Sequence, residues 1–251
     1  MLKGEREQEI LGMLKESGGF VTVKTLCEKL YASESSIRRD LADMEKKGLI
    51  QRSYGGAELT TNYSRIAAFT LRYTQNSAAK KKIAMKAASL ITDNSILFLD
   101  QSSSALHLAE AIPNKSSITV ITNNVEIMHL LSESNITVIS SGGFLSRENR
   151  SCLVGVDAMK IFENSYADTC FFACRGLSED GVISDFAREE VVVRDAIIKN
   201  ARTKVFLCDS RKFGIRAPYK QCTLSEVDYL ITENASAAES YTKDFPNLKI
   251  L

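Results

Sequence analysis

The chain has 251 residues, of which 44% are hydrophobic and 25% charged, with 32 lysines and arginines against 31 aspartates and glutamates. This composition lies close to the globular average and excludes disordered, collagen-like and coiled-coil classes, and no stretch reaches the ~18 apolar residues of a membrane span. The formal net charge of +1 does not exclude a nucleic-acid partner, because net charge is a sum whereas binding surfaces are local.

Residues 1–57 show the helical periodicity of several short helices. Apolar residues recur at helical spacing in three stretches, the third of which is Ile37, Leu41 and Met44. Thr22 and Ser33 are placed to cap the second and third helices. The Gly18-Gly19 pair is expected to end the first helix, and Gly48 the third.

A hairpin is predicted directly after the third helix, with arms over Leu49–Ser53 and Ala57–Leu59. Three helices and a hairpin in so short a segment predict a winged helix-turn-helix domain over residues 1–57. At 100° per residue, Ser35, Arg39 and Lys46 lie opposite the apolar stripe of the third helix. Short hydroxyl and cationic side chains of this kind contact phosphates and base edges. We therefore expect operator DNA to be bound by Ser33, Ser35, Ser36, Arg38, Arg39, Lys46 and Arg52. The alternative is a solvated helix face, in which Arg39 pairs with Asp43.

Residues 58–75 have no clean period and are predicted to be a linker. From residue 76 to 251, short apolar runs alternate with helical stretches, which predicts an α/β domain with a parallel sheet covered on both faces. The predicted strands are Ile96–Leu99, Ile118–Ile121, Thr137–Ser140, Thr169–Ala173, Lys204–Cys208, Tyr229–Thr232 and Leu248–Leu251. The predicted helices are 77–92, 103–111, 124–133, 152–164 and 187–200.

Polar clusters follow four of these strands, beginning at Asp100, Thr122, Ser141 and Asp209. In open α/β sheets, ligands bind beyond the carboxyl ends of the strands. A phosphate is bound well by hydroxyls at a helix start, by glycines and by cations. Sugar hydroxyls are bound well by amide and carboxylate groups. The candidate effector-binding residues are Asp100, Ser102, Ser103, Ser104, Asn123, Asn124, Gly142, Gly143, Arg147, Asp209 and Lys212. For each of them a helix cap, a turn or a surface charge is the alternative, and the run from Lys80 to Lys82 is expected to be a solvated helix start.

The six cysteines lie within apolar runs, and there is no Cys-x-x-Cys pair. With only two histidines, His107 and His129, a metal site is not expected, and neither histidine is expected to have a chemical role. The charged start of the chain differs from a signal peptide. These features predict a reduced, cytoplasmic protein without a cofactor.

The run from Ser33 to Leu41, SESSIRRDL, followed by Gly48-Leu49-Ile50-Gln51-Arg52 and Gly55-Gly56-Ala57, closely resembles the DeoR family of bacterial transcription regulators. The likeness extends over nearly the whole chain, through Arg72, Asn76 and Lys80 to Asp209-Ser210-Arg211-Lys212. A departure from the family pattern is Ser102, which stands where a glycine is common.

This resemblance implies a Rossmann-like sensor domain similar to ribose-5-phosphate isomerase, and it adds Arg175 to the effector-binding candidates. It also implies a repressor of a carbohydrate-metabolism operon that is controlled by a phosphorylated sugar and acts as a homo-oligomer, either a dimer or a tetramer. The alternative is a sugar-phosphate isomerase or deaminase fused to a DNA-binding unit. No catalytic motif of those enzymes is complete, so a non-enzymatic protein is expected.

Overall fold

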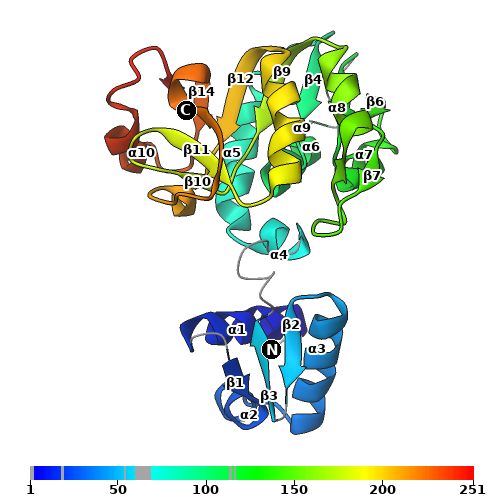
Figure 1. The fold of residues 1–251 in the computed structure, drawn as a ribbon, viewed down its shortest axis with the longest axis vertical. Helices are drawn as coiled ribbons and strands as arrows, with labels where there is room; N and C mark the ends of the chain where they lie inside the picture. The colour runs from blue at the N-terminus through cyan, green and yellow to red at the C-terminus, as the bar shows by residue number, and fades with distance from the viewer. Residues whose placement is uncertain (1–2, 18–19, 54, 60–68, 113–114, 116) are drawn as a thin grey trace. The chain divides into compact units, whose positions relative to one another are not determined.

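A computed structural model describes residues 3–17, 20–53, 55–59, 69–112, 115 and 117–251. The chain divides into two compact units, Met1–Ala68 and Phe69–Leu251, which are described separately (Figure 1). We predicted a linker over residues 58–75. Residues 60–68 lie outside the described part of the chain, whereas a helix begins at Phe69 and belongs to the second unit.

The N-terminal unit consists of three helices and a small antiparallel sheet. Its helices are α1 (Lys3–Glu16), α2 (Val23–Leu30) and α3 (Glu34–Lys46), and its strands are β1 (Phe20–Thr22), β2 (Ile50–Ser53) and β3 (Gly56–Leu59). Strands β2 and β3 form the predicted hairpin, and β1, which the sequence did not predict, pairs with β3 on its other side. Gly18 and Gly19, expected to end α1, lie outside the described residues.

Local sequence accounts for where α2 and α3 begin and end. The hydroxyl of Thr22 accepts a hydrogen bond from the backbone N–H of Thr25, and that of Ser33 accepts one from Ser36, as the capping expectation required. Gly48 follows α3 with a φ of 70°, in the left-handed region that ends many helices. On the inner face of α3, Ile37 and Met44 are completely buried, and each such side chain stabilises the fold by about 1.5–3 kcal/mol.

The C-terminal unit has a parallel seven-stranded sheet at its centre. The strand order is β15-β14-β12-β9-β4-β5-β6. These strands are β4 (Ile96–Leu99), β5 (Thr119–Thr122), β6 (Thr137–Ser140), β9 (Ala167–Phe172), β12 (Ala201–Leu207), β14 (Tyr229–Ile231) and β15 (Lys249–Ile250). All seven predicted strands are present, with ends that shift by up to a few residues, so the predicted α/β fold class is confirmed.

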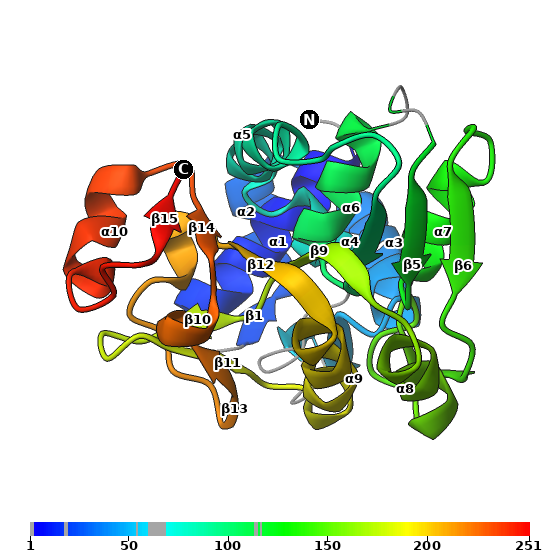
Figure 2. The same ribbon diagram turned by 90° about the horizontal axis from the view of Figure 1, so that it is seen from above.

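Helices cover both faces of this sheet (Figure 2). One core is formed with α4 (Phe69–Thr74), α5 (Ser77–Ala88), α6 (Ser103–Ala111) and α7 (Val125–Leu131). The other is formed with α8 (Val156–Glu163), α9 (Arg188–Lys199) and α10 (Ala235–Thr242). Because both faces are covered, the strands are apolar on both sides; Phe98 and Leu99 of β4 are completely buried on opposite faces.

The order of the strands reverses between β4 and β9. From β4 the chain proceeds outward through β5 and β6, and it then returns to the other side of β4 as β9. Such a reversal opens a crevice at the carboxyl ends of the two strands, where open α/β sheets bind ligands. The segment after β4 holds Ser102, and the segment after β9 holds Arg175, so residues from both sides meet at this point.

Two smaller sheets complete the unit. An antiparallel sheet has the order β10-β11-β13, and β7 pairs with β8. These strands are β7 (Phe144–Leu145), β8 (Leu153–Val154), β10 (Gly176–Leu177), β11 (Val182–Asp185) and β13 (Tyr219–Thr223), with single 3-10 turns at η1 (Ser210–Lys212) and η2 (Leu224–Glu226). We predicted a helix from residue 152, but residues 153–154 are strand β8 and the helix begins at Val156.

Candidate functional site

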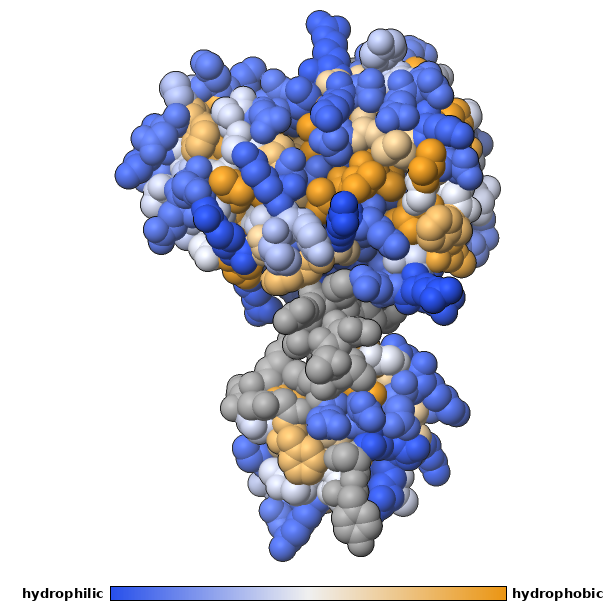
Figure 3. All heavy atoms as spheres, viewed as in Figure 1, coloured by the Kyte–Doolittle hydropathy of each residue, from blue (hydrophilic) through white to orange (hydrophobic). Residues whose placement is uncertain are grey.

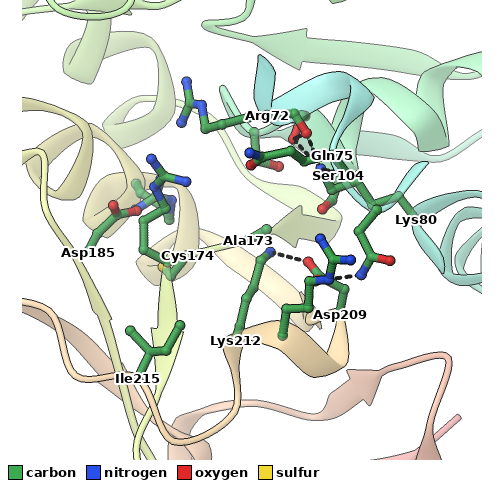
Figure 4. Close-up of a pocket in the computed structure, with 16 residues that line it drawn as sticks. Arg72, Gln75, Lys80, Ser104, Ala173, Cys174, Asp185, Asp209, Lys212 and Ile215 are labelled. Atoms are coloured by element: carbon green, nitrogen blue, oxygen red, sulfur yellow. Dashed lines mark hydrogen bonds and ion pairs between the residues drawn. The ribbon is translucent and has the colours of Figure 1, made fainter. Parts of the chain in front are cut away.

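A cavity of about 220 Å³ lies at the reversal between β4 and β9. Among the described residues that line it, six are cationic and two are acidic. They are Arg72, Gln75, Asn76, Lys80, Ser102, Ser103, Ser104, Ala173, Cys174, Arg175, Asp185, Arg194, Asp209, Arg211, Lys212 and Ile215. Figure 4 shows Arg72, Lys80 and Lys212 approaching this space from three separate elements. The excess of cationic groups favours an anionic ligand.

The start of α6 forms one wall of the cavity. Ser102 caps the helix, because its hydroxyl accepts a 3.0 Å hydrogen bond from the Ala105 N–H. The next two serines, Ser103 and Ser104, also line the cavity. The Oγ atom of Ser104 is buried and has no hydrogen-bond partner among the described residues. A helix N-terminus that carries hydroxyls is suited to a phosphate or carboxylate group.

Lys80 lies in the first turn of α5 and is almost completely buried, with 5% of its surface exposed. Its ammonium group donates hydrogen bonds to the carbonyl of Arg72, to the carbonyl of Gln75 at 2.8 Å and to the hydroxyl of Ser103 at 3.1 Å. Burial, helped by the nearby charge of Lys212, lowers the pKa of Lys80 to about 7. We expected Lys80, Lys81 and Lys82 to be solvated together, but only the latter two are exposed.

Arg72 comes from α4, and its side chain is only 11% exposed. Its NH1 atom lies 3.9 Å from Oε2 of Glu190, whereas its Nε and NH2 atoms are buried without a hydrogen-bond partner among the described residues. Buried guanidinium donors that stay unpaired are costly, so they mark a place where a ligand with acceptor oxygens gains hydrogen bonds.

Asp209 and Lys212 stand on the opposite side of the cavity, at and just before the turn η1. Asp209 accepts a 2.9 Å hydrogen bond from Asn76 Nδ2 and lies 3.4 Å from Lys212 Nζ. Burial alone would raise the pKa of Asp209, but Lys212, Asn76 and Lys80 outweigh it and hold that pKa below the usual value. Asp209 is therefore an ionised acceptor, which is suited to the hydroxyl groups of a polyol or sugar.

A buried ionic cluster supports the cavity floor. Arg194 of α9 is 1% exposed, and it contacts Asp100 Oδ2 at 2.9 Å and Asp185 Oδ2 at 3.1 Å. Its third carboxylate neighbour is Glu190, at 3.6 Å, and Gln221 accepts a further bond at 3.1 Å. Burial alone would lower the pKa of Arg194, but the surrounding charged groups, among them Asp185, Asp100 and Glu190, raise that pKa well above its ordinary value. The cluster fixes Arg194 and neutralises its charge, so the other cations dominate the field in the cavity.

The structure brings half of the predicted effector residues together at the cavity. These are Ser102, Ser103, Ser104, Arg175, Asp209 and Lys212.

Asp100, Asn123 and Asn124, also predicted, lie outside the cavity lining and make structural bonds instead. Asp100 is completely buried, and it accepts from the backbone N–H of Ser102 at 3.0 Å and from Arg194. Asn124 caps α7 by accepting from Glu126 N at 3.0 Å. The amide of Asn123 donates to the carbonyl of Leu153 at 3.1 Å, although its Oδ1 atom has no partner among the described residues. Asn124 therefore acts as a helix cap in this structure, which is the alternative to effector binding that the sequence left open.

Gly142, Gly143 and Arg147 also lie away from the cavity, around the β7–β8 hairpin. Gly143 has a φ of 90°, and a Cβ atom there would lie 2.5 Å from the carbonyl oxygen of Val154. This glycine therefore allows close packing within the hairpin region, and the turn alternative accounts for its presence. Arg147 is exposed in the loop between the two strands.

The sequence reasoning missed part of the cavity lining. Arg72, Gln75 and Asn76 fell within the predicted linker or at its edge, and Cys174 and Asp185 lie in or beside strands. A signal was present in the family likeness, which includes Arg72, Asn76 and Lys80. Their charges carry no local periodicity, and only the tertiary fold places them beside the start of α6.

The candidate DNA-binding surface is the exposed face of α3. Arg39 and Lys46 are exposed, and no ion pair of either is found among the described residues. The hydroxyls of Ser33, Ser35 and Ser36 cluster at the start of the helix, with Ser33 Oγ 3.1 Å from Ser35 Oγ and 2.9 Å from Ser36 Oγ. Figure 3 shows that hydrophilic side chains predominate on the described part of the visible face of this unit.

The other two residues predicted to contact DNA are arginines, and each forms an ion pair with a carboxylate. Arg38 pairs with Glu34 at 2.7 Å, and Arg52 of the hairpin pairs with Glu45 at 2.6 Å. Asp40 of the same helix is buried and bound to Arg6. Because Arg38 is paired, Arg39 and Lys46 are the cations of α3 that are exposed and have no ion pair among the described residues.

Other kinds of site find little support in the described residues. No cluster of His, Cys, Asp and Glu there is suited to a metal ion. All six cysteines are free, and five of them are buried. Among the described helices, none is long and apolar enough to cross a membrane.

Known proteins match this chain over nearly its whole length. Residues 6–62 match the DeoR-like helix-turn-helix domain, and residues 75–234 match the DeoR C terminal sensor domain. The chain is 32% identical to the HTH-type transcriptional regulator GolR of Listeria innocua, over 97% of this chain and 95% of that protein. It is 29% identical to the glycerol-3-phosphate regulon repressor of Escherichia coli, over 93% and 92% of the two chains. It is also 29% identical to the L-fucose operon activator of the same species, over 95% and 98%.

Among solved structures, ribose 5-phosphate isomerase A of Methanocaldococcus jannaschii aligns with 55% of each chain, at 17% identity and a TM-score of 0.42. The curated relatives are transcriptional regulators and not enzymes. The two family matches together confirm the resemblance that the motifs of the third helix indicated. The chain therefore belongs to the DeoR family of transcriptional regulators, with a DNA-binding helix-turn-helix domain followed by a sensor domain for a small-molecule effector.

Proposed function

We propose that this protein is a repressor whose binding to operator DNA is controlled by a phosphorylated sugar in the cavity at the start of α6. The observation that carries the proposal is a set of unpaired buried donors beside several cations. Ser104 and Arg72 both line the cavity, and Ser104 Oγ and the Nε and NH2 atoms of Arg72 are buried without a hydrogen-bond partner among the described residues. A phosphate group supplies acceptor oxygens for each of them.

The rest of the cavity is suited to the sugar part of such a ligand. Asp209 is an ionised acceptor, and Asn76 and Gln75 offer amide groups that both donate and accept. The volume of about 220 Å³ is below the roughly 300–1,000 Å³ of pockets for drug-sized ligands. A small effector of monosaccharide size is therefore favoured.

The bonds that hold α4 suggest how occupancy of the cavity is transmitted. The carbonyl of Arg72, in α4, accepts hydrogen bonds from Lys80 and from Ser103 Oγ at 3.3 Å, and both donors border the cavity. A phosphate competes for the same two donors and for the Arg72 side chain. Its binding therefore changes the bonds that fix α4, the element of the sensor domain nearest in sequence to the DNA-binding domain.

Such a ligand acts on DNA binding only through its different affinity for the two states of the protein. The name of the E. coli glycerol-3-phosphate regulon repressor supports a phosphorylated effector and repression, whereas the L-fucose operon activator has the opposite sign. We propose repression with release on effector binding. We also propose a homo-oligomer, because helix-turn-helix proteins commonly bind paired half-sites with matching symmetry.

The test is a DNA-binding titration with the chain's own upstream region, followed by fluorescence anisotropy at fixed salt. A panel of sugar phosphates is added, each beside the same sugar without phosphate. The proposal expects at least one phosphorylated member to release the DNA and to raise the melting temperature of the protein, while its unphosphorylated partner does neither. If no phosphorylated sugar shifts the melting temperature, the proposed ligand class is wrong.

A further inference from the structure

Tyr31, in the turn between α2 and α3, has an unfavourable combination of conformation and environment. Its φ of 49° and ψ of 42° place it in the left-handed region, which tyrosine rarely adopts and glycine or asparagine adopts readily. Its backbone N–H closes α2 by bonding to the carbonyl of Cys27. The backbone therefore uses this conformation as a helix cap, and the aromatic side chain is not needed for it.

The side chain receives no support from the fold. Tyr31 is 96% exposed, the most exposed of the large hydrophobic residues in the described chain. No hydrogen bond, ion pair or ring contact of its side chain is found among the described residues. A strained backbone and a solvated aromatic ring both cost free energy in the isolated domain, and a contact of the ring with another molecule would offset that cost.

The position of Tyr31 indicates which molecule that is. Two residues later, Ser33 caps α3 and gathers the hydroxyls of Ser35 and Ser36 around the helix start. In helix-turn-helix proteins the start of the second helix approaches the base edges, and the preceding helix crosses the phosphate backbone. The turn that carries Tyr31 joins these two elements, so its side chain projects beside the backbone of bound DNA.

We propose that Tyr31 is a DNA contact, in which the phenol hydroxyl donates a hydrogen bond to a phosphate oxygen of the strand that flanks the base-reading residues of α3. Tyrosine hydroxyls are among the groups that bind DNA phosphates, and such bonds position the protein without reading sequence. The proposal rests on the DNA-binding role of the family and is independent of the effector.

Two variants at this position separate binding from folding. Tyr31→Phe removes only the hydroxyl and keeps the backbone and ring. Tyr31→Asn removes the ring and suits the left-handed conformation, so it is expected to raise the melting temperature. The matched control is Tyr166→Phe, because Tyr166 is also a highly exposed tyrosine, at 83%, and lies in the sensor domain.

Affinity is measured by anisotropy for the full-length protein on the operator and on an unrelated duplex of the same length. Tyr31→Phe is expected to weaken both complexes by about 10-fold or more, the range of one hydrogen bond to a charged group. Tyr31→Asn is expected to weaken both at least as much in spite of its higher melting temperature, and Tyr166→Phe to change neither. Unchanged affinity in Tyr31→Phe overturns the proposal, and so does a loss confined to the operator, since that result points to a base contact.

Discussion

The ammonium nitrogen of Lys80 lies 3.1 Å from the hydroxyl oxygen of Ser103, which joins the first turn of α5 to the first turn of α6. Both side chains also donate to the carbonyl of Arg72. The effector cavity and the last turn of α4 therefore share the same two donors. This sharing is the physical basis for expecting a ligand in the cavity to affect α4.

The Ser104 hydroxyl gives a direct test of the phosphate site. Since this buried group has no partner among the described residues, its removal in Ser104→Ala should leave the stability of the ligand-free protein unchanged or slightly higher. The same change should weaken effector binding about 10-fold or more, because one hydrogen bond to the charged phosphate is lost. Calorimetric titration measures the affinity, with the exposed Ser236→Ala as control. Equal affinity in Ser104→Ala and wild type would contradict the assigned phosphate position.

Effector binding should depend on pH through Lys80. Its pKa in the folded protein is about 7, lowered from 10.5, so the side chain loses its proton as the pH rises through 7. A phosphate dianion prefers the protonated form, and its own second pKa is about 6. Affinity should therefore fall between pH 7 and pH 8.5, and binding above pH 7 should take up protons.

The pH dependence has a matched control and a second readout. Lys80→Met should bind more weakly and lose most of the pH dependence in that window. The stability of the ligand-free protein should change with pH in the opposite direction to effector affinity. Between pH 7 and pH 10.5 the unfolded chain binds more protons at Lys80 than the folded protein does, so the contribution of Lys80 to the free energy of unfolding rises with pH. Proton uptake is obtained from titrations in two buffers of different ionisation enthalpy. An identical slope in wild type and Lys80→Met would exclude Lys80 as the responsive group.

His107 tests whether α4 transmits the signal. This buried residue stacks on Tyr73 with 4.6 Å between ring centres, and its Nε2 atom lies 3.2 Å from the Tyr73 carbonyl of α4. It lies outside the cavity lining, so His107→Phe should leave effector affinity within about twofold while it loosens α4. The expected result is normal effector binding with a weaker effect on DNA release. If release per bound effector is unchanged, α4 is not the coupling element.

Arg39 tests the DNA-binding surface. Arg39→Ala removes an exposed, unpaired cation from α3 and should weaken operator binding about 10-fold or more, with a smaller effect on unrelated DNA. The melting temperature and effector affinity should stay at their wild-type values, because the side chain is exposed and lies in the other unit from the effector cavity. Arg202→Ala, an exposed change in β12, is the control. A variant with wild-type operator affinity would show that another face of α3 enters the groove.

The central sheet and the winged helix-turn-helix could be predicted because their signals are local. Strands of the parallel sheet such as Ile96–Leu99, which is buried from Leu97 to Leu99, are continuous apolar runs, and the caps Thr22 and Ser33 stand next to the helices they begin. The strands β10, β11 and β13 were missed. Strand β10 has only two residues, and β11 pairs with β13 across more than 30 residues of chain.

The candidate site could be predicted only in part, for a related reason. The serines at the start of α6 and the Asp209–Lys212 turn follow strands and were found. Asp100 was assigned to the site because the sequence does not reveal its partner Arg194, which lies 94 residues away. Lys80 was assigned to solvent because its neighbours are charged, although the fold buries it. The direction of a polar side chain depends on contacts that are distant in sequence.

In the proposed function, phosphate bound at Arg72 and Ser104 controls operator binding. The most direct measurement is DNA release by the most effective sugar phosphate, compared with the same sugar without phosphate, in wild type and in Arg72→Met. We expect the phosphorylated sugar alone to release wild-type protein from the operator, and we expect Arg72→Met to bind the operator normally and to show little release. Equal release by the two sugars, or undiminished release from Arg72→Met, would contradict the proposed function.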